Sequence, residues 1–261
     1  MRESRFRLLV EPISACIVQR MTVSAALPPS RIDATLIRGL EASKWLAIIL
    51  MVLSHAGMGA GGALAWPAFW IGRVCAPIFC FIIVARLSEK PEERSRRYLF
   101  RLLAWGIPAQ IPFHFWLSSY GFHLNELISW SFGVAAIRLW IKGHRLLAIL
   151  ISSGLLVAAG LYRLELVAAS VMLTGYVLFQ RSPSLAILAI SAGYAAVPLY
   201  HRPYELLAPA LCMLSPLAVA ICGLPSSARL VRLPGWFFYA IYPAHIALVF
   251  LVFGICPPLR S

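Results

Sequence analysis

The segment Lys44-WLAIILMVLS-His55 places a basic residue and a histidine at the two ends of an apolar run. At a rise of about 1.5 Å per helical residue, the imidazole of His55 lies roughly 16 Å beyond Lys44. That distance is near the middle of a hydrocarbon core about 30 Å thick. An ionisable side chain at this depth is costly to bury and by default marks a functional site. The segment therefore predicts a first membrane helix that carries a functional histidine.

The composition of the whole chain favours the same environment. Hydrophobic residues make up 61% of the 261 residues, charged residues only 13%, and the mean hydropathy is +0.81. These values indicate a polytopic membrane protein. The formal net charge of +13 could indicate nucleic-acid binding, but on so apolar a chain a basic excess is typical of cytoplasmic loops. We therefore expect a lipid bilayer as the partner, and no nucleic acid.

Apolar runs between helix breakers predict an all-α transmembrane bundle of about nine spans, with eight to ten compatible with the pattern. The expected spans are residues 43–60, 66–86, 100–119, 123–141, 145–162, 164–180, 184–200, 204–223 and 235–254. Only Tyr162 and Arg163 lie at the junction of the segments 145–162 and 164–180, and eight spans result if these two segments are not separate spans. With a cytoplasmic N-terminus, inside segments hold 19 of the 23 lysines and arginines, so the positive-inside rule predicts this orientation.

The chain is expected to contain one folded domain. Residues 43–254 form the helical membrane domain, and residues 255–261 a short C-terminal tail. Residues 1–42 lack the long apolar core of a signal peptide. They are interpreted as a cytoplasmic or surface segment, either amphipathic or disordered, and no chemistry is assigned to them.

Four polar residues share one layer of the predicted bundle, from the midplane to its outer half: His55, Arg73, His114 and His245. A histidine in a membrane often only bonds a neighbouring helix. Burial of Arg73 demands more than burial of a histidine, because a guanidinium keeps its charge and needs a partner or an anionic ligand. The three histidines could also bind zinc, but no carboxylate is expected at that depth to support such ligands. No metal is therefore expected.

Six segments, taken in order, resemble the TraX family over roughly residues 39 to 253. That family comprises multi-span inner-membrane proteins that acetylate the N-terminus of conjugative pilin, with relatives in fimbrial assembly. The segments are Leu40-EASKWLAIILMVLSHA-Gly57, Gly72-RVCAPIFCFII-Val84, Arg94-SRRYLFRL-Leu103, Gln110-Ile111-Pro112-Phe113, Leu124-Asn125 and Phe237-FYAIYPAHIA-Leu248.

The resemblance implies a multi-pass protein of the bacterial inner membrane with an acyltransferase-like domain. The spacing of Lys44 and His55 is also similar to a basic-X10-His signature in the broader membrane acyltransferase family 3. By this likeness His55 is the catalytic histidine, Arg73 the arginine of a GR-x-x-x-P-x-F segment, and Asn125 and Tyr242 lie in motifs expected to bind substrate. Family members commonly carry acids where this chain has Ser54 and His114.

The residues also fit acetyl transfer on chemical grounds. Acetyl transfer needs a base or nucleophile, a donor for the developing oxyanion, and an anchor for coenzyme A phosphates. An apolar setting favours the uncharged imidazole of His55, while Arg73 keeps its charge and is expected to stabilise the oxyanion. His114 and His245 complete the expected catalytic set. A cytoplasmic collar is expected to bind the phosphates of acetyl-CoA, and it comprises Lys44, Arg94, Arg96, Arg97 and Arg101.

The expected function is therefore transfer of an acetyl group from cytosolic acetyl-CoA to an acceptor at the periplasmic side, which the family identifies as the α-amine of pilin. An O-acyltransferase acting on a surface glycan or lipid headgroup is the nearest alternative, because the same site does not distinguish amine from hydroxyl. A non-catalytic pilus assembly protein and a proton-coupled transporter also remain open.

Overall fold

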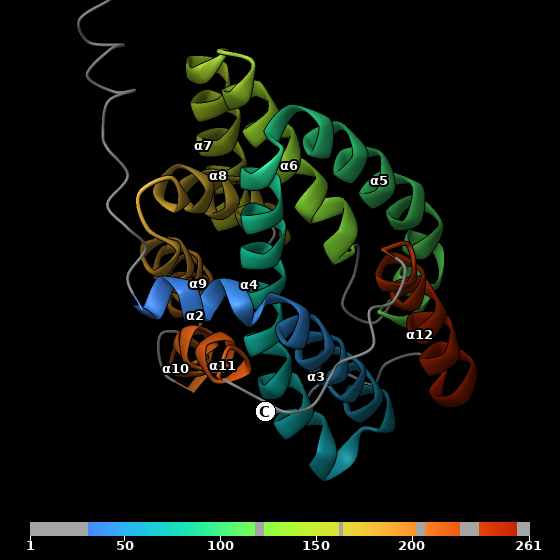
Figure 1. Ribbon diagram of the computed structural model, residues 1–261. Coiled ribbons are helices and arrows are strands. Elements are labelled where there is room, and N and C mark those ends of the chain that lie inside the picture. The colour runs from blue at the N-terminus through green and yellow to red at the C-terminus, as the bar shows by residue number, and fades with distance from the viewer. Residues whose placement is uncertain (1–30, 118–122, 162–163, 202–206, 225–234, 255–261) are drawn as a thin grey trace, which may run out of the picture. The chain divides into compact units, whose positions relative to one another are not determined.

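The computed structural model describes residues 31–117, 123–161, 164–201, 207–224 and 235–254. Within these ranges the chain contains helices and two short 3-10 turns and no strand, so the predicted all-α class is confirmed (Figure 1). The helices are α2 (Arg31–Arg38), α3 (Leu40–Ala60), α4 (Ala65–Glu89), α5 (Pro91–Trp116), α6 (Glu126–Ile141), α7 (Arg145–Leu161), α8 (Ala168–Phe179), α9 (Pro183–His201), α10 (Leu207–Met213), α11 (Ser215–Cys222) and α12 (Phe237–Phe253).

Most of the predicted segments each coincide with one helix. The segments at 145–162 and 164–180 are two separate helices, α7 and α8, with a 3-10 turn over Leu164–Val167 before the second. The segment at 204–223 is instead divided into α10 and α11, which meet at Leu214. Pro216 in the first turn of α11 explains the division, because proline is favoured at helix starts and cannot continue a preceding helix.

Two helices are long and apolar enough to cross a membrane by length and composition, Leu40–Ala60 and Trp70–Glu89. Shorter apolar stretches include α8, α12 and most of α7. Many large apolar side chains of α7 and α12 face outward, among them Leu146, Leu150, Val157, Leu248 and Leu251. Exposed apolar surface on this scale favours a lipid environment, since soluble proteins limit such patches.

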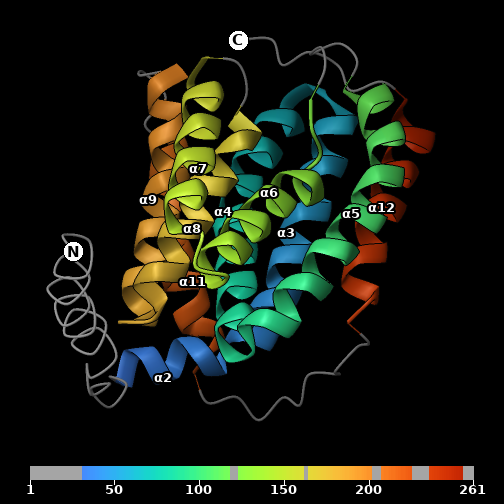
Figure 2. The ribbon, with the colours of Figure 1, turned by 90° about the horizontal axis from the view of Figure 1, so that it is seen from above.

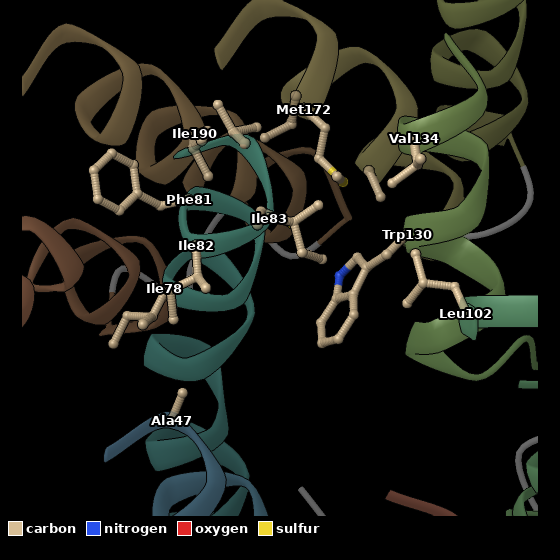
Figure 3. Packing of buried hydrophobic residues seen from close by; sticks show 14 of the residues in the cluster. Ala47, Ile78, Phe81, Ile82, Ile83, Leu102, Trp130, Val134, Met172 and Ile190 are labelled. Carbon is tan, nitrogen blue, oxygen red and sulfur yellow. The ribbon is translucent and has the colours of Figure 1, made fainter. Parts of the chain in front are cut away.

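Helix α4 lies in the middle of the described helices. It packs against α3 and α5 and also against α8, α9, α10 and α11; Figure 2 shows it between the helices α7 to α9 and the group formed by α3, α5 and α12. Its residues 80–85 are all buried, and Figure 3 shows Ile83 of α4 facing Trp130 of α6 and Met172 of α8. A helix that is apolar all round is expected at such a central place.

The crossing of α3 and α4 depends on a missing side chain. A Cβ atom added at Gly72 would clash with the hydroxyl oxygen of Ser54 and would lie 3.0 Å from the Ser54 Cβ. Small residues at a helix crossing let two backbones approach closely. The residues that follow each of these two, His55 and Arg73, are therefore carried on backbone segments in direct contact.

Pro77 interrupts the backbone hydrogen bonding of α4 one turn after Arg73. Proline has no N–H, so the carbonyl of Arg73 loses its usual helical donor. The thiol of Cys212 on α10 lies 3.5 Å from this oxygen, and the hydroxyl of Ser215 donates to the carbonyl of Val74 at 3.1 Å. Side chains of neighbouring helices commonly satisfy a membrane helix at a proline in this way.

One end of the bundle is held by ion pairs. Glu41 on α3 binds both Lys44, at 2.8 Å, and Arg86 on α4, while Glu89 binds Arg86 at 2.9 Å and Arg94 on α5. Two carboxylates thus connect the ends of three helices. Figure 2 shows α2 lying crosswise at one end of these helices.

Helix α2 belongs to the segment for which disorder was one interpretation. Its Leu36 is buried, and its buried Asp33 accepts hydrogen bonds from the hydroxyl of Ser182 at 3.0 Å and of Ser184 at 2.7 Å. Residues 31–38 are therefore helical and packed against the bundle. Residues 1–30 and the predicted tail 255–261 lie outside the described residues.

Gly72→Ala is expected to destabilise the protein by about 1–3 kcal/mol, because the added methyl group overpacks the contact with Ser54. The matched control is Gly154→Ala on α7, where nothing lies within 4 Å of an added Cβ and alanine should be neutral or stabilising. Thermal unfolding of both variants in the same detergent measures the difference. Equal unfolding temperatures for the two would contradict the proposed close crossing.

Candidate functional site

Two histidines from opposite ends of the sequence form the centre of the site. His55 lies on α3 and His245 on α12, and Nδ1 of His55 is 2.7 Å from Nε2 of His245. The two ring planes differ by only 5° and their centroids are 5.0 Å apart. Both rings had been predicted as site residues, and the structure joins them by a direct hydrogen bond.

A backbone carbonyl determines which nitrogens of the pair carry protons. Nδ1 of His245 lies 2.8 Å from the carbonyl oxygen of Ile241, and a carbonyl can only accept, so this nitrogen is the donor. In neutral His245 the Nε2 atom is then an acceptor, and His55 must donate to it from Nδ1. In this series of hydrogen bonds, the one ring nitrogen with a free lone pair is therefore Nε2 of His55.

The Nε2 atom of His55 is the nitrogen at the outer end of the histidine pair. Within the part of the chain that the structure describes, it has no hydrogen-bond partner. His55 is partly buried, whereas His245 is only 5% exposed. The more buried His245 thus holds the ring of His55 in a fixed orientation. Catalytic bases in proteins are commonly oriented by a third group in this way.

Aromatic rings surround this pair. Trp116 at the end of α5 makes an edge-on contact with His55, with ring centroids 5.0 Å apart and planes at 71°. Tyr242 makes a similar contact with His245 at 5.5 Å and 84°. The hydroxyl of Tyr242 also accepts a hydrogen bond of 3.1 Å from the backbone N–H of Glu126. Tyr242, predicted to bind substrate, is thus buried beside His245 and connects α12 to the start of α6.

The approach of α12 to α3 depends on Gly59, one turn after His55. An added Cβ at this position would lie 3.0 Å from Val249 and 2.9 Å from Phe253 of α12. Val249 itself lies one turn after His245, so the glycine contact and the histidine pair occupy the same interface. The close packing at Gly59 therefore sets the distance across which the two rings bond.

Asn125 was also predicted to contact substrate, and its side chain has several partners within the protein. Its Oδ1 accepts from the N–H groups of Leu127 and Ile128 at 3.1 and 3.2 Å, which caps α6. Its Nδ2 donates to the carbonyl of Gly106 at 2.8 Å and to Gln110 at 3.0 Å. These bonds use the two donors and two acceptor positions of the amide. A substrate contact would have to displace one of them.

Arg73 lies where α4 meets α10. The thiol of Cys212 on α10 lies 3.5 Å from its carbonyl oxygen, and the neighbouring Gly72 lies against Ser54 of α3. The structure thus brings the backbone of Arg73 close to both α3 and α10. Its predicted role at the oxyanion stays a prediction.

His114 is not part of the pair. It is exposed on α5 and its ring lies beside that of Phe115 at 6.0 Å. Buried positions on α5 recur at spacings of three and four, through Leu102, Gly106, Ala109, Phe113 and Trp116. That spacing, which is visible in the sequence, turns Trp116 toward the bundle and His114 away from it.

The described residues contain no group of three or more His, Cys, Asp or Glu side chains able to hold a metal ion. The bond between His55 and His245 also directs their facing nitrogens at each other rather than at a shared point. This geometry differs from a zinc site, in which each ligand nitrogen points at the ion.

The predicted cytoplasmic collar divides into two groups. Lys44, Arg94 and Arg97 are each bound to a glutamate. Across the described ranges, neither Arg96 nor Arg101 forms an ion pair. Arg101 lies near the start of α12, since its guanidinium would be 3.4 Å from a Cβ added at Gly235.

Comparison with known proteins identifies a family. The family model described as TraX protein matches residues 39–253, which is most of the chain. No curated protein and no solved structure matches the chain.

Asn125→Ala is expected to lower the free energy of unfolding by about 1–3 kcal/mol, because it removes a helix cap and leaves the carbonyl of Gly106 without its donor. Asn125→Ser keeps an oxygen that can cap α6 and should cost less. Thermal unfolding in detergent ranks the three proteins. An alanine variant as stable as the parent, yet impaired in substrate binding, would instead support the predicted substrate contact.

Proposed function

The chain belongs to the TraX family, and on that premise we propose that it transfers an acetyl group from cytosolic acetyl-CoA to the N-terminal amine of a pilin subunit. The observation that carries this proposal is the hydrogen-bond chain from the Ile241 carbonyl through His245 to His55. It leaves a basic nitrogen, Nε2 of His55, in an aromatic interior. Such a nitrogen is what an incoming amine requires when it loses its proton.

The proposed topology is a multi-pass protein of the bacterial inner membrane with about nine crossings and a cytoplasmic N-terminus. The outward-facing apolar side chains of α7 and α12 support a lipid environment. The distribution of lysine and arginine over the loops supports the orientation. In this orientation the ion-paired ends of α3, α4 and α5 face the cytosol, and His55 lies in the outer half of the bilayer.

In the proposed reaction His55 acts as a general base. Its Nε2 accepts a proton from the pilin amine as the amine nitrogen attacks the acetyl carbonyl carbon. The carbon–sulfur bond then breaks, and the coenzyme A thiolate leaves with the proton that His55 returns. An α-amine has a typical pKa near 7.7–8.0, so about a tenth of it is neutral and able to attack at pH 7. His55 takes up the proton that the amine nitrogen loses as it bonds to the carbonyl carbon.

His245 has a supporting role in this step. When His55 accepts a proton, its Nδ1–H remains bonded to Nε2 of His245 at 2.7 Å, and a charge-assisted bond of this kind is stronger than a neutral one. The carbonyl of Ile241 holds His245 in the tautomer that can accept. His245 thus stabilises the imidazolium without itself changing protonation state.

The proposed acetyl-CoA path follows the interface of α3, α5 and α12. Arg101 lies at its cytosolic mouth near the start of α12, and Arg96 is exposed on α5 five residues earlier. Neither forms an ion pair among the described residues, and a guanidinium suits phosphate groups. Aromatic rings flank the path, where Tyr98 of α5 meets Tyr239 of α12 and Trp45 of α3 meets Phe238. The long pantetheine arm would then reach His55, about 16 Å above Lys44 along α3.

His55→Ala should reduce acetylation by about 10²–10⁴-fold, as expected for loss of a general base, and His245→Ala should reduce it less because the base remains. His144→Ala, which changes an exposed histidine before α7, serves as the control. The measurement is mass spectrometry of pilins and surface glycans from strains that carry each variant. Wild-type acetylation by a folded His55→Ala protein would contradict the assigned role, and an acetyl group on glycan instead of pilin would favour the O-acyltransferase.

Arg96→Gln combined with Arg101→Gln should weaken acetyl-CoA binding by about 10-fold at low salt, and less at high salt because exposed charges are screened. Arg181→Gln, an exposed arginine between α8 and α9, should have little effect. Titration of purified protein with acetyl-CoA at two ionic strengths measures both. Equal affinity for the double variant and the parent would exclude this phosphate site.

A further inference from the structure

The indole N–H of Trp116 is buried without a partner. Trp116 is only 1% exposed, and its Nε1 atom has no hydrogen-bond acceptor among the described residues. A buried donor left unbonded costs roughly 1–3 kcal/mol, and such groups are few in folded proteins. An unpaired donor beside a functional site therefore indicates a ligand that supplies the acceptor.

The neighbouring polar groups contrast with this indole. His245 is bonded on both ring nitrogens, and the amide of Asn125 uses all its positions. Even the other buried unpaired indole, Trp130, lies beside the hydroxyl of Tyr194. Around His55, an unused donor and an unused acceptor thus remain together: the N–H of Trp116 and the Nε2 of His55.

This combination matches the chemistry of acyl transfer. The Trp116 ring contacts His55 with centroids 5.0 Å apart, so a group bound at Nε2 of His55 lies within reach of the indole. An attacking amine donates a proton to an acceptor, and the carbonyl oxygen of the acyl group accepts from a donor. The attack of an amine on a thioester therefore uses both free groups at once, because the amine proton binds Nε2 of His55 and the carbonyl oxygen accepts from the indole N–H.

We propose that the indole N–H of Trp116 donates to the acetyl carbonyl oxygen and so forms the oxyanion site for the transfer. The inference rests on the proposed function and names the residue that binds the acyl group. As the amine nitrogen bonds to the carbonyl carbon, the oxygen becomes anionic and the indole bond strengthens. When the carbon–sulfur bond breaks, the carbonyl reforms and the thiolate leaves.

Trp116→Phe tests this role, because it keeps an aromatic ring against His55 and removes only the donor. Trp130→Phe is the matched control, since it removes an equally buried indole N–H that packs on Phe79 instead. Trp116→Phe should not destabilise the fold, because replacing an unpaired buried donor by an apolar group is close to neutral. Trp130→Phe removes an indole that lies beside the hydroxyl of Tyr194, so the thermal unfolding of both variants is measured as well. Purified full-length protein in detergent is titrated with acetyl-CoA and with coenzyme A, and pilin acetylation is measured in cells.

We expect wild type and Trp130→Phe to bind acetyl-CoA more tightly than coenzyme A. In Trp116→Phe this preference should fall about 10-fold, and acetylation by about 10²-fold, as for loss of one oxyanion donor. An unchanged preference and rate in Trp116→Phe would overturn the inference while leaving the proposed function intact. Wild-type protein that binds neither compound would overturn the proposed function, and the inference with it.

A measurement on the unmodified protein covers the case in which Trp116→Phe fails to fold. The chain has eight tryptophans, and ¹⁵N labelling of their indoles gives one N–H signal for each. Acetyl-CoA should shift one of these signals downfield, as expected for a new hydrogen bond, and coenzyme A should not. If no indole signal distinguishes the two compounds, the assignment of Trp116 is wrong.

Discussion

The hydrogen bond from Nδ1 of His245 to the carbonyl of Ile241 is the constraint on which the site depends. A main-chain oxygen cannot change its role from acceptor to donor, so the protons of the two histidines are ordered from the backbone outward. Without this fixed end, either neutral tautomer of His55 would be available. With it, the free lone pair lies on Nε2 of His55, the nitrogen that has no hydrogen-bond partner among the described residues.

This chain of bonds is possible only because three helices approach closely. Gly59 lets α12 lie against α3, and Gly72 lets α4 lie against the same helix near Ser54. In lipid, helices gain little from apolar contact alone, so close approach at small residues and a few interhelical hydrogen bonds carry much of the association. The glycines that hold the bundle together thus also set the spacing of the histidine pair, and stability and site geometry share the same contacts.

The sequence predicted the helices well because apolar runs and breakers are local signals. It could not show that His55 and His245 are partners, because an interhelical bond across 190 residues leaves no local pattern. The burial of Trp116 could have been predicted from the sequence, because the buried positions of α5 recur every three or four residues and include Trp116 but not His114. The depth of His114 along α5 matches that of the other predicted site residues. The direction of a side chain around the helix, however, decides whether it faces the bundle.

The ion pairs of the described residues lie away from the histidine pair. Carboxylates and basic side chains are paired at the ends of α3, α4 and α5. A cation beside His55 would have to be buried in lipid surroundings at considerable cost. A neutral indole avoids that cost, because it can stabilise a transient negative charge without carrying a permanent one. The proposed Trp116 donor thus differs from the predicted Arg73 donor in one respect, since it needs no charged partner while the site is empty.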